Sequence, residues 1–112
     1  MQVRLVLVAK QGEQPTDMTL GDAIAVEVSP ERLIRIGRSG DVDIDVQAST
    51  VGRRVAQLSQ AGAELWVQDL GSGGGSRLEV EGKVICRPDR AVPNGALLWI
   101  GEVGFRVEIG PA

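Results

Sequence analysis

Histidine is absent from this chain of 112 residues, and cysteine occurs only once, as Cys86. The missing histidine removes the commonest general base and the commonest metal ligand. A single cysteine allows no internal disulfide and no thiolate zinc site within the chain, and we interpret Cys86 as a buried strand thiol. No P-loop, GxSxG or EF-hand pattern occurs. We therefore expect a protein that is not an enzyme and has neither a cofactor nor a metal site.

Long apolar runs and a strong excess of one charge are also missing. The longest apolar run, near 96–100, is far too short to cross a bilayer, and the N-terminal segment lacks the apolar region of a signal peptide. We expect a cytoplasmic protein without membrane insertion. The formal net charge is only -3, so no overall basic field favours nucleic acid. Any anion-binding site must be local.

Apolar and polar residues alternate over short stretches, and no segment has persuasive helical periodicity. Strands are predicted at 3–10, 23–28, 32–38, 42–46, 54–60, 63–70, 77–87 (a two-stranded ribbon turned at 81–83), 96–101 and 103–109. A tight turn is predicted at 60–62, and surface loops at 11–22 and 88–95. About ten short strands predict an all-β sandwich, formed by one domain over 1–112.

Three aspartates alternate with apolar residues in the stretch DVDIDV. The period of two places Asp41, Asp43 and Asp45 on one face of the predicted strand. We favour a solvated face. A hard-cation site is the alternative, although such ions usually collect their ligands from a curved loop.

The two tryptophans, Trp66 and Trp99, lie on predicted strands. Core packing is the favoured interpretation, and an exposed anchor for a partner is the alternative. In AELWVQDL, Leu65 and Val67 share one face, which directs Trp66 to the other. The run around Trp99 is apolar on both faces, so it does not indicate whether Trp99 faces the core or the solvent.

Two polar segments stand out between the predicted strands. In IGRSGDVDI, Arg38 and Ser39 lie between two glycines, so a guanidinium and a hydroxyl share one turn. The segment GSGGGS, 71–76, is interpreted as a folded loop rather than a flexible linker, because strands are predicted on both sides. Its glycines can expose backbone N–H groups to an anion or a carbonyl. A plain structural turn fits that segment equally well.

Several motifs occur in a fixed order: GRS at 37–39, DVDI at 41–44, VGRRVAQL at 51–58, DLGSGGGS at 69–76 and EGKVI at 81–85. Together they resemble the forkhead-associated (FHA) domain family, which has a GRS turn, a D-I strand, a VSRxHAxL turn and a DLGSxNGTxVNGxxI hairpin. The resemblance is strongest over 32–109. It implies a β-sandwich of eleven strands whose loops at one end bind phosphothreonine peptides, so a fold of about ten to eleven strands is expected.

The resemblance assigns the phosphate to Arg38, with Ser39 and Arg53 assisting. A planar guanidinium suits this task because it donates two parallel hydrogen bonds to a phosphate. The predicted phosphopeptide-binding set, where it is retained, is Arg38, Ser39, Arg53, Ser72, Gly73, Gly74, Gly75 and Ser76.

The chain departs from the family pattern at several positions, among them Ser76, where the family has threonine. Gly52 replaces the serine that bonds the phosphate, and Gly74 replaces the asparagine that holds the peptide backbone. Val55 replaces a largely structural histidine, where an apolar residue can still support the loop by packing. A hydrogen bond to a charged group contributes on the order of 1.5–3 kcal/mol, so a weaker phosphate site is predicted. Candidates for compensation in the same predicted loops are Ser49, Thr50, Arg54 and Ser72.

These features predict a divergent FHA-type adaptor or scaffold module. It would bind a protein partner through its loop end or a sheet face, with phosphate dependence weakened or lost. The alternative is a functional phosphothreonine-peptide-binding domain in Ser/Thr kinase signalling. The expected partner is a protein or phosphopeptide, and the sequence specifies neither its identity nor the oligomeric state.

Overall fold

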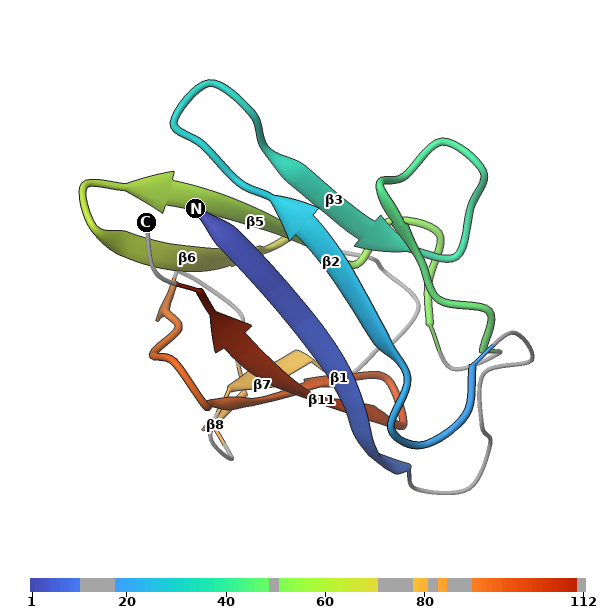
Figure 1. Ribbon diagram of the computed structural model, residues 1–112. Helices are drawn as coiled ribbons and strands as arrows, with labels where there is room; N and C mark the ends of the chain where they lie inside the picture. Colours follow the sequence, from blue (N-terminus) through green and yellow to red (C-terminus); the bar gives the residue numbers. More distant parts are fainter. Residues whose placement is uncertain (11–17, 49–50, 71–77, 81–82, 85–89, 111–112) are drawn as a thin grey trace.

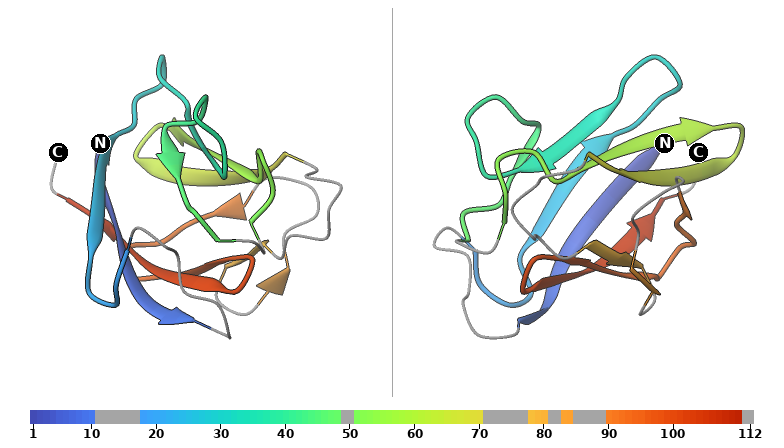
Figure 2. Two further views of the ribbon diagram at one scale, coloured as in Figure 1. Left: turned by 90° about the vertical axis from the view of Figure 1, so that its right-hand side faces the viewer. Right: turned by 180° about the vertical axis from the view of Figure 1, so that it is seen from behind.

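Two β-sheets packed face to face form the computed structural model (Figure 1). The structure describes residues 1–10, 18–48, 51–70, 78–80, 83–84 and 90–110. These residues form no helix, so none of their segments is a helix long and apolar enough to cross a membrane. Seen from the side in Figure 2, the blue and red strands of one sheet lie in one layer and the teal and green strands of the other lie in the second.

The first sheet contains β1 (Gln2–Lys10), β2 (Ala23–Glu27), β7 (Leu78–Val80), β8 (Lys83–Val84), β10 (Leu97–Ile100) and β11 (Val103–Ile109). The second contains β3 (Ile34–Gly37), β4 (Ile44–Asp45), β5 (Ala56–Ala61), β6 (Glu64–Asp69) and β9 (Arg90–Ala91). Their orders are β2-β1-β11-β10-β7-β8 and β4-β3-β5-β6-β9. The β3–β4 pair is parallel, whereas β1 pairs with β2 and β11 in antiparallel ladders. The predicted all-β sandwich is confirmed.

The core lies between the two sheets and is filled by the alternate apolar residues of their strands. Its largest fully buried side chains include Phe105, Leu5, Leu7, Ile34, Ile36, Leu58 and Leu65. No polar or charged residue is buried in the described part of the chain. Removal of this apolar surface from water is the main stabilising contribution in such a fold.

Two predicted loop boundaries are wrong. The segment 88–95 is not an unpaired loop, since β9 lies within it and pairs with β6. The predicted turn at 60–62 is displaced, because β5 continues to Ala61, which pairs with Glu64. The two-residue turn therefore begins at Gly62, whose φ of 62° suits a tight hairpin.

The predicted row of aspartates on one strand face is also wrong. Only Ile44 and Asp45 form β4, and Asp41 and Asp43 lie in the turn before it. The carboxylate of Asp43 accepts a hydrogen bond from the backbone N–H of Arg35 at 2.9 Å. Among the described residues, no cluster of three His, Cys, Asp or Glu side chains could hold a metal ion. The carboxylates of the turn thus make local contacts instead of forming a row.

Both tryptophans are half-buried, and neither belongs to the core between the sheets. Trp66 lies on the face of β6 opposite the buried Leu65 and Val67, as the alternation predicted. Trp99 lies across Gly104 of the neighbouring β11. The favoured core interpretation is therefore wrong for both, while Cys86 lies outside the described residues.

Candidate functional site

The predicted GRS turn follows β3 at one end of the second sheet. Gly37, the last residue of β3, touches the backbone of the 51–54 loop, because a Cβ at this position would lie 2.1 Å from the carbonyl oxygen of Arg53. Only glycine permits so close an approach. The backbone N–H of Arg38 then donates to the carbonyl of Gly52 at 2.8 Å. Backbone contacts thus bring the GRS turn and the 51–54 loop together.

Arg38 is exposed but anchored. Its Nε–H donates to the carbonyl oxygen of Val51 at 3.2 Å, and Val51 itself is buried. The described residues offer no partner to the two Nη groups of Arg38, nor to the exposed guanidinium of Arg53. Toward the described residues, these two side chains can therefore donate to an anion without first breaking an ion pair.

Ser39 and Arg54 are occupied by a neighbouring carboxylate. The hydroxyl of Ser39 donates to Oδ1 of Asp41 at 2.5 Å, and Nη2 of Arg54 donates to Oδ2 at 2.5 Å. The hydrogen bond from Ser39, and next the one from Arg54, lower the pKa of Asp41 to about 2. Asp41 is therefore ionised at neutral pH. We call this trio, Ser39, Asp41 and Arg54, the aspartate clasp.

The aspartate clasp was not predicted from the sequence. The Ser39–Asp41 contact could have been predicted, since a serine two residues before an aspartate often hydrogen-bonds within a turn. The Arg54–Asp41 contact has no sequence pattern that indicates it, because the two residues are 13 positions apart in the chain.

The remaining site positions are only partly described. Val55 is fully buried in the core, a position from which an apolar side chain can support the loop by packing. The N–H of Leu70 donates to the carbonyl of Val55 at 3.0 Å, which places the residue before the glycine-rich segment beside the same loop. The predicted site residues Ser49, Thr50, Ser72, Gly73, Gly74, Gly75 and Ser76 lie outside the described residues.

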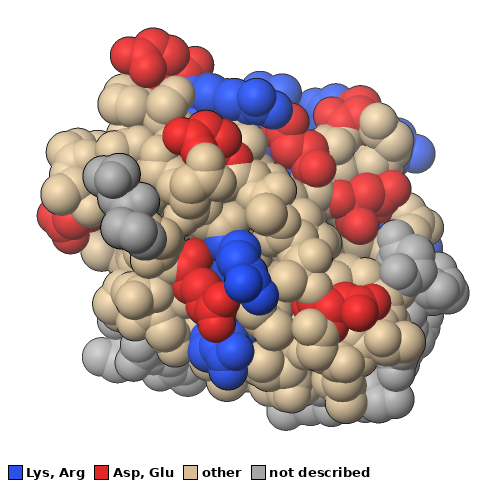
Figure 3. All heavy atoms as spheres, viewed as in Figure 1, with Lys and Arg blue, Asp and Glu red and all other residues tan. Residues whose placement is uncertain are grey.

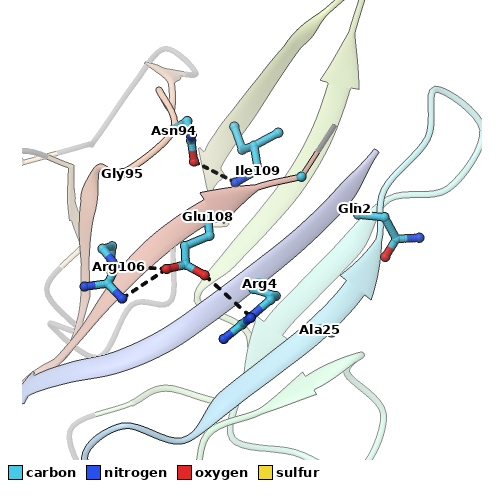
Figure 4. A pocket seen from close by; sticks show the side chains of 9 residues that line it. Gln2, Arg4, Ala25, Asn94, Gly95, Arg106, Glu108 and Ile109 are labelled. Atoms are coloured by element: carbon cyan, nitrogen blue, oxygen red, sulfur yellow. Dashed lines mark hydrogen bonds and ion pairs between the residues drawn. The ribbon is translucent and has the colours of Figure 1, made fainter. Parts of the chain in front are cut away.

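A groove on the outer face of the first sheet is a second candidate surface (Figure 4). Its volume is about 560 Å³, and its lining includes Arg4, Arg106 and Glu108. The carboxylate of Glu108 pairs with Nη2 of Arg106 at 3.0 Å and with Nε of Arg4 at 3.5 Å. On the face shown in Figure 3, acidic and basic side chains are interleaved. This surface therefore presents no broad field of one sign to a partner.

A family model for the FHA domain matches residues 34–101, which is more than half of the chain. The chain belongs to the FHA domain family. FHA domains are non-catalytic modules that bind phosphopeptides and mediate protein interactions, so this FHA domain is not an enzyme. The family resemblance of the sequence motifs is confirmed.

Solved structures share the fold over nearly the whole chain. An FHA domain of a hypothetical protein from Arabidopsis thaliana has a TM-score of 0.77 and 20% identity, with 99% of this chain and 89% of that chain covered. The FHA domain of a Chlamydia trachomatis protein has a TM-score of 0.75 and 14% identity, covering 99% and 100%. EmbR of Mycobacterium tuberculosis, solved with a low affinity phosphopeptide, has a TM-score of 0.73 and 22% identity, covering 99% and 25%. No curated protein matches the sequence.

Proposed function

We propose that this FHA domain is an adaptor or scaffold module that binds a protein partner with weakened dependence on phosphothreonine. The observation that carries the proposal is the aspartate clasp beside Arg38. A single domain over 1–112 and a cytoplasmic location belong to the same proposal. The ligand class is that of the family, and the phosphopeptide bound to EmbR supports it.

The aspartate clasp weakens a phosphate site in two ways. The carboxylate of Asp41 accepts a hydrogen bond from the Ser39 hydroxyl, whose O–H is then not directed at a ligand. Its ionised carboxylate also places a negative charge in the turn that contains Arg38, and this charge repels a phosphate. Because the side chains of Asp41 and Arg54 are 52% and 56% exposed, solvent screens this repulsion, and a moderate effect is expected.

Gly52 weakens the same site further. Gly52 has no side-chain donor, and its backbone carbonyl already accepts a hydrogen bond from the N–H of Arg38. A serine there would add a hydroxyl donor. The absence of that hydrogen bond to a charged group corresponds to about 1.5–3 kcal/mol, or about tenfold to a hundredfold in affinity.

Phosphothreonine recognition of ordinary strength is the second candidate function. It is favoured by Arg38, because the Val51 carbonyl holds Nε, while the Nη groups, which bond no described residue, are available to clamp a phosphate. Arg53 would then assist from the adjoining loop.

A titration of isotope-labelled protein with a degenerate phosphothreonine peptide pool, beside its unphosphorylated twin, tests the proposal. We expect weak amide shifts that differ little between the two pools. Large shifts at Arg38, Ser39 and Arg53 with the phosphorylated pool alone would contradict the proposal and establish the second candidate.

Two gain-of-function variants sharpen the test. Gly52→Ser restores a hydroxyl and is expected to raise affinity for the phosphorylated pool by about tenfold to a hundredfold. Asp41→Asn removes the negative charge and is expected to raise this affinity by a smaller factor, because solvent screens the exposed carboxylate. Arg38→Ala should abolish that gain when it is combined with either variant. Arg32→Ala, which removes an exposed arginine before β3, is the matched control and should preserve it.

A further inference from the structure

The strands at the edges of the two sheets differ in length. In the described residues, the outermost strands β4, β8 and β9 have two residues each, whereas β2 has five. Short edge strands are a common protection against pairing with another chain, and so are prolines and lysines on the edge. The sequence of β2, AIAVE, contains neither proline nor lysine. Its edge is therefore the one of these four best suited to strand addition.

One set of backbone groups on β2 has no partner in the described part of the chain. At the two ends of the β1–β2 ladder, the N–H of Leu7 donates to the carbonyl of Asp22 and the N–H of Val28 donates to the carbonyl of Met1, each at 2.9 Å. Because bonded residues alternate along an antiparallel strand, the N–H and C=O groups of Ala23, Ala25 and Glu27 point away from β1. All three residues are exposed, and none of them has a backbone partner beyond β2 among the described residues.

The side chains of β2 leave this edge accessible. Ala23 and Ala25 are small, so they do not shield the free backbone groups. Ile24 and Val26 face the core but are only partly buried. A strand added beside β2 would complete their burial as well as the hydrogen-bond ladder.

We propose that β2 pairs with β2 of a second copy of this chain, antiparallel about a two-fold axis at Ala25. In this register Ala25 faces Ala25 of the second copy, Ile24 faces Val26, and Ala23 faces Glu27. Apolar residues meet apolar residues, and no like charges lie directly opposite. Each copy presents the same patch to the other, as a two-fold interface requires.

Glu27 does not oppose this arrangement. Its carboxylate accepts a hydrogen bond from Nε2 of Gln2 within one copy, and in this register it faces the uncharged Ala23 of the second copy. The interface extends the six-stranded sheet of each copy into a continuous sheet across the dimer. It uses no residue of the GRS turn or the 51–54 loop, so it is independent of the proposed function.

A weak dimer is expected, because one strand pair buries much less than the roughly 1,200 Å² that stable complexes need. Sedimentation velocity of the full chain, from micromolar to millimolar concentration, measures it. Ala25→Pro removes an outward N–H without touching the β1–β2 ladder, and proline is tolerated on such an edge. Ala25→Lys places two like charges on the axis, and Ala63→Lys, in the exposed β5–β6 turn, is the matched control.

The wild-type chain should associate with increasing concentration, and both Ala25 variants should weaken dimerisation at least about tenfold. Ala63→Lys should leave it unchanged. A mixture of Ala25→Lys and Ala25→Glu should associate again, since opposite charges then meet on the axis. Slow amide exchange at Ile24 and Val26 checks that β2 stays paired with β1 in every variant.

Three results would overturn the proposal. The first is a wild-type chain that remains monomeric throughout the concentration range. The second is association that survives both Ala25→Pro and Ala25→Lys, because the contact would then lie elsewhere. The third is protection of the Ala23, Ala25 and Glu27 amides only after an unrelated extended peptide is added, which would assign the edge to a different occupant.

Discussion

Asp41 determines which donors the GRS turn can offer to a ligand. A hydroxyl next to Arg38 looks like part of an anion site when only the sequence is considered. The structure shows that Ser39 donates to Asp41 instead, and that the same carboxylate holds Arg54. A short polar turn can therefore contain its own competing acceptor, and a motif match does not reveal this.

The titration of Asp41 tests the aspartate clasp directly. Because hydrogen bonds from Ser39 and Arg54 lower its pKa to about 2, Ser39→Ala or Arg54→Ala should raise it toward the usual value, with the larger rise for Ser39→Ala. Carbon-13 NMR of the side-chain carboxyl group measures the change. An Asp41 titration that is the same in both variants as in the wild type would contradict the assignment.

The direction of the pH effect on stability follows from the same lowered pKa. A carboxyl group whose pKa is lower in the folded state stabilises the fold at pH values above its unfolded pKa, which is about 4. This contribution is lost as the pH falls through about 2, where Asp41 becomes protonated in the folded state. Arg54→Ala should therefore make the unfolding free energy less dependent on pH within this acidic window.

Gly37 holds the two loops of the site together. Gly37→Ala should lower the free energy of unfolding by about 1–3 kcal/mol, because the new Cβ would lie 2.1 Å from the carbonyl oxygen of Arg53. Urea denaturation measures the loss, and the amide shifts of Arg38 and Gly52 report the displaced loop. Gly40→Ala is the control, since nothing lies within 4 Å of its added Cβ. Equal stability of the two variants would refute the close approach.

The β10–β11 hairpin shows how a glycine within a strand can serve packing. Gly104 pairs with Trp99 across the two strands, and a Cβ on Gly104 would lie 3.2 Å from three atoms of the Trp99 ring. The indole thus covers the backbone where a side chain is missing. This accounts for a half-buried tryptophan on a face that does not point into the core.

Gly104→Ala should displace the Trp99 ring. Fluorescence in a Trp66→Phe background isolates this indole, and we expect a shift of its emission maximum together with a loss of about 1–2 kcal/mol in unfolding free energy. Gly40→Ala in the same background should change neither quantity. An unchanged emission maximum in the Gly104 variant would show that the ring does not cover this position.

Among the described residues, Phe105 is the one aromatic side chain in the buried core. Aromatic residues make up only 3% of the chain, and Phe105 is its single phenylalanine. Phe105 lies on β11, which pairs with both β1 and β10, and its side chain is fully buried. A defect at this position therefore affects the middle of the first sheet as well as its contact with the second.

Phe105→Ala should lower the unfolding free energy by about 3–5 kcal/mol, because it leaves a cavity that the sheets can fill only in part. Domains of this kind are stable by about 5–15 kcal/mol, so the variant should unfold at much lower urea concentration. Leu20→Ala, at a side chain that is 53% exposed, should change stability by less than about 0.5 kcal/mol. Similar urea midpoints for the two variants would contradict this account of the core.

The strand pattern and the family could be predicted from the sequence because both depend on local order. Alternation of period two marks a half-buried strand wherever it runs for several residues, as in 54–60 and 63–70. The order of the motifs, from the GRS turn to the EGKVI stretch, is likewise visible in the sequence and requires no tertiary information. β9 was missed because a strand of two residues has no alternation to detect.

The sequence by itself determined the fold class and the family, and it shows that the chain has no histidine and a single cysteine. Only the tertiary structure decided that Ser39 and Arg54 share one carboxylate, that Gly37 touches Arg53, and that β2 is an outermost strand of its sheet. The physical reason is distance along the chain. Periodicity reports which face of a strand is buried, but contacts between remote segments depend on how the strands are ordered and registered in the sheets.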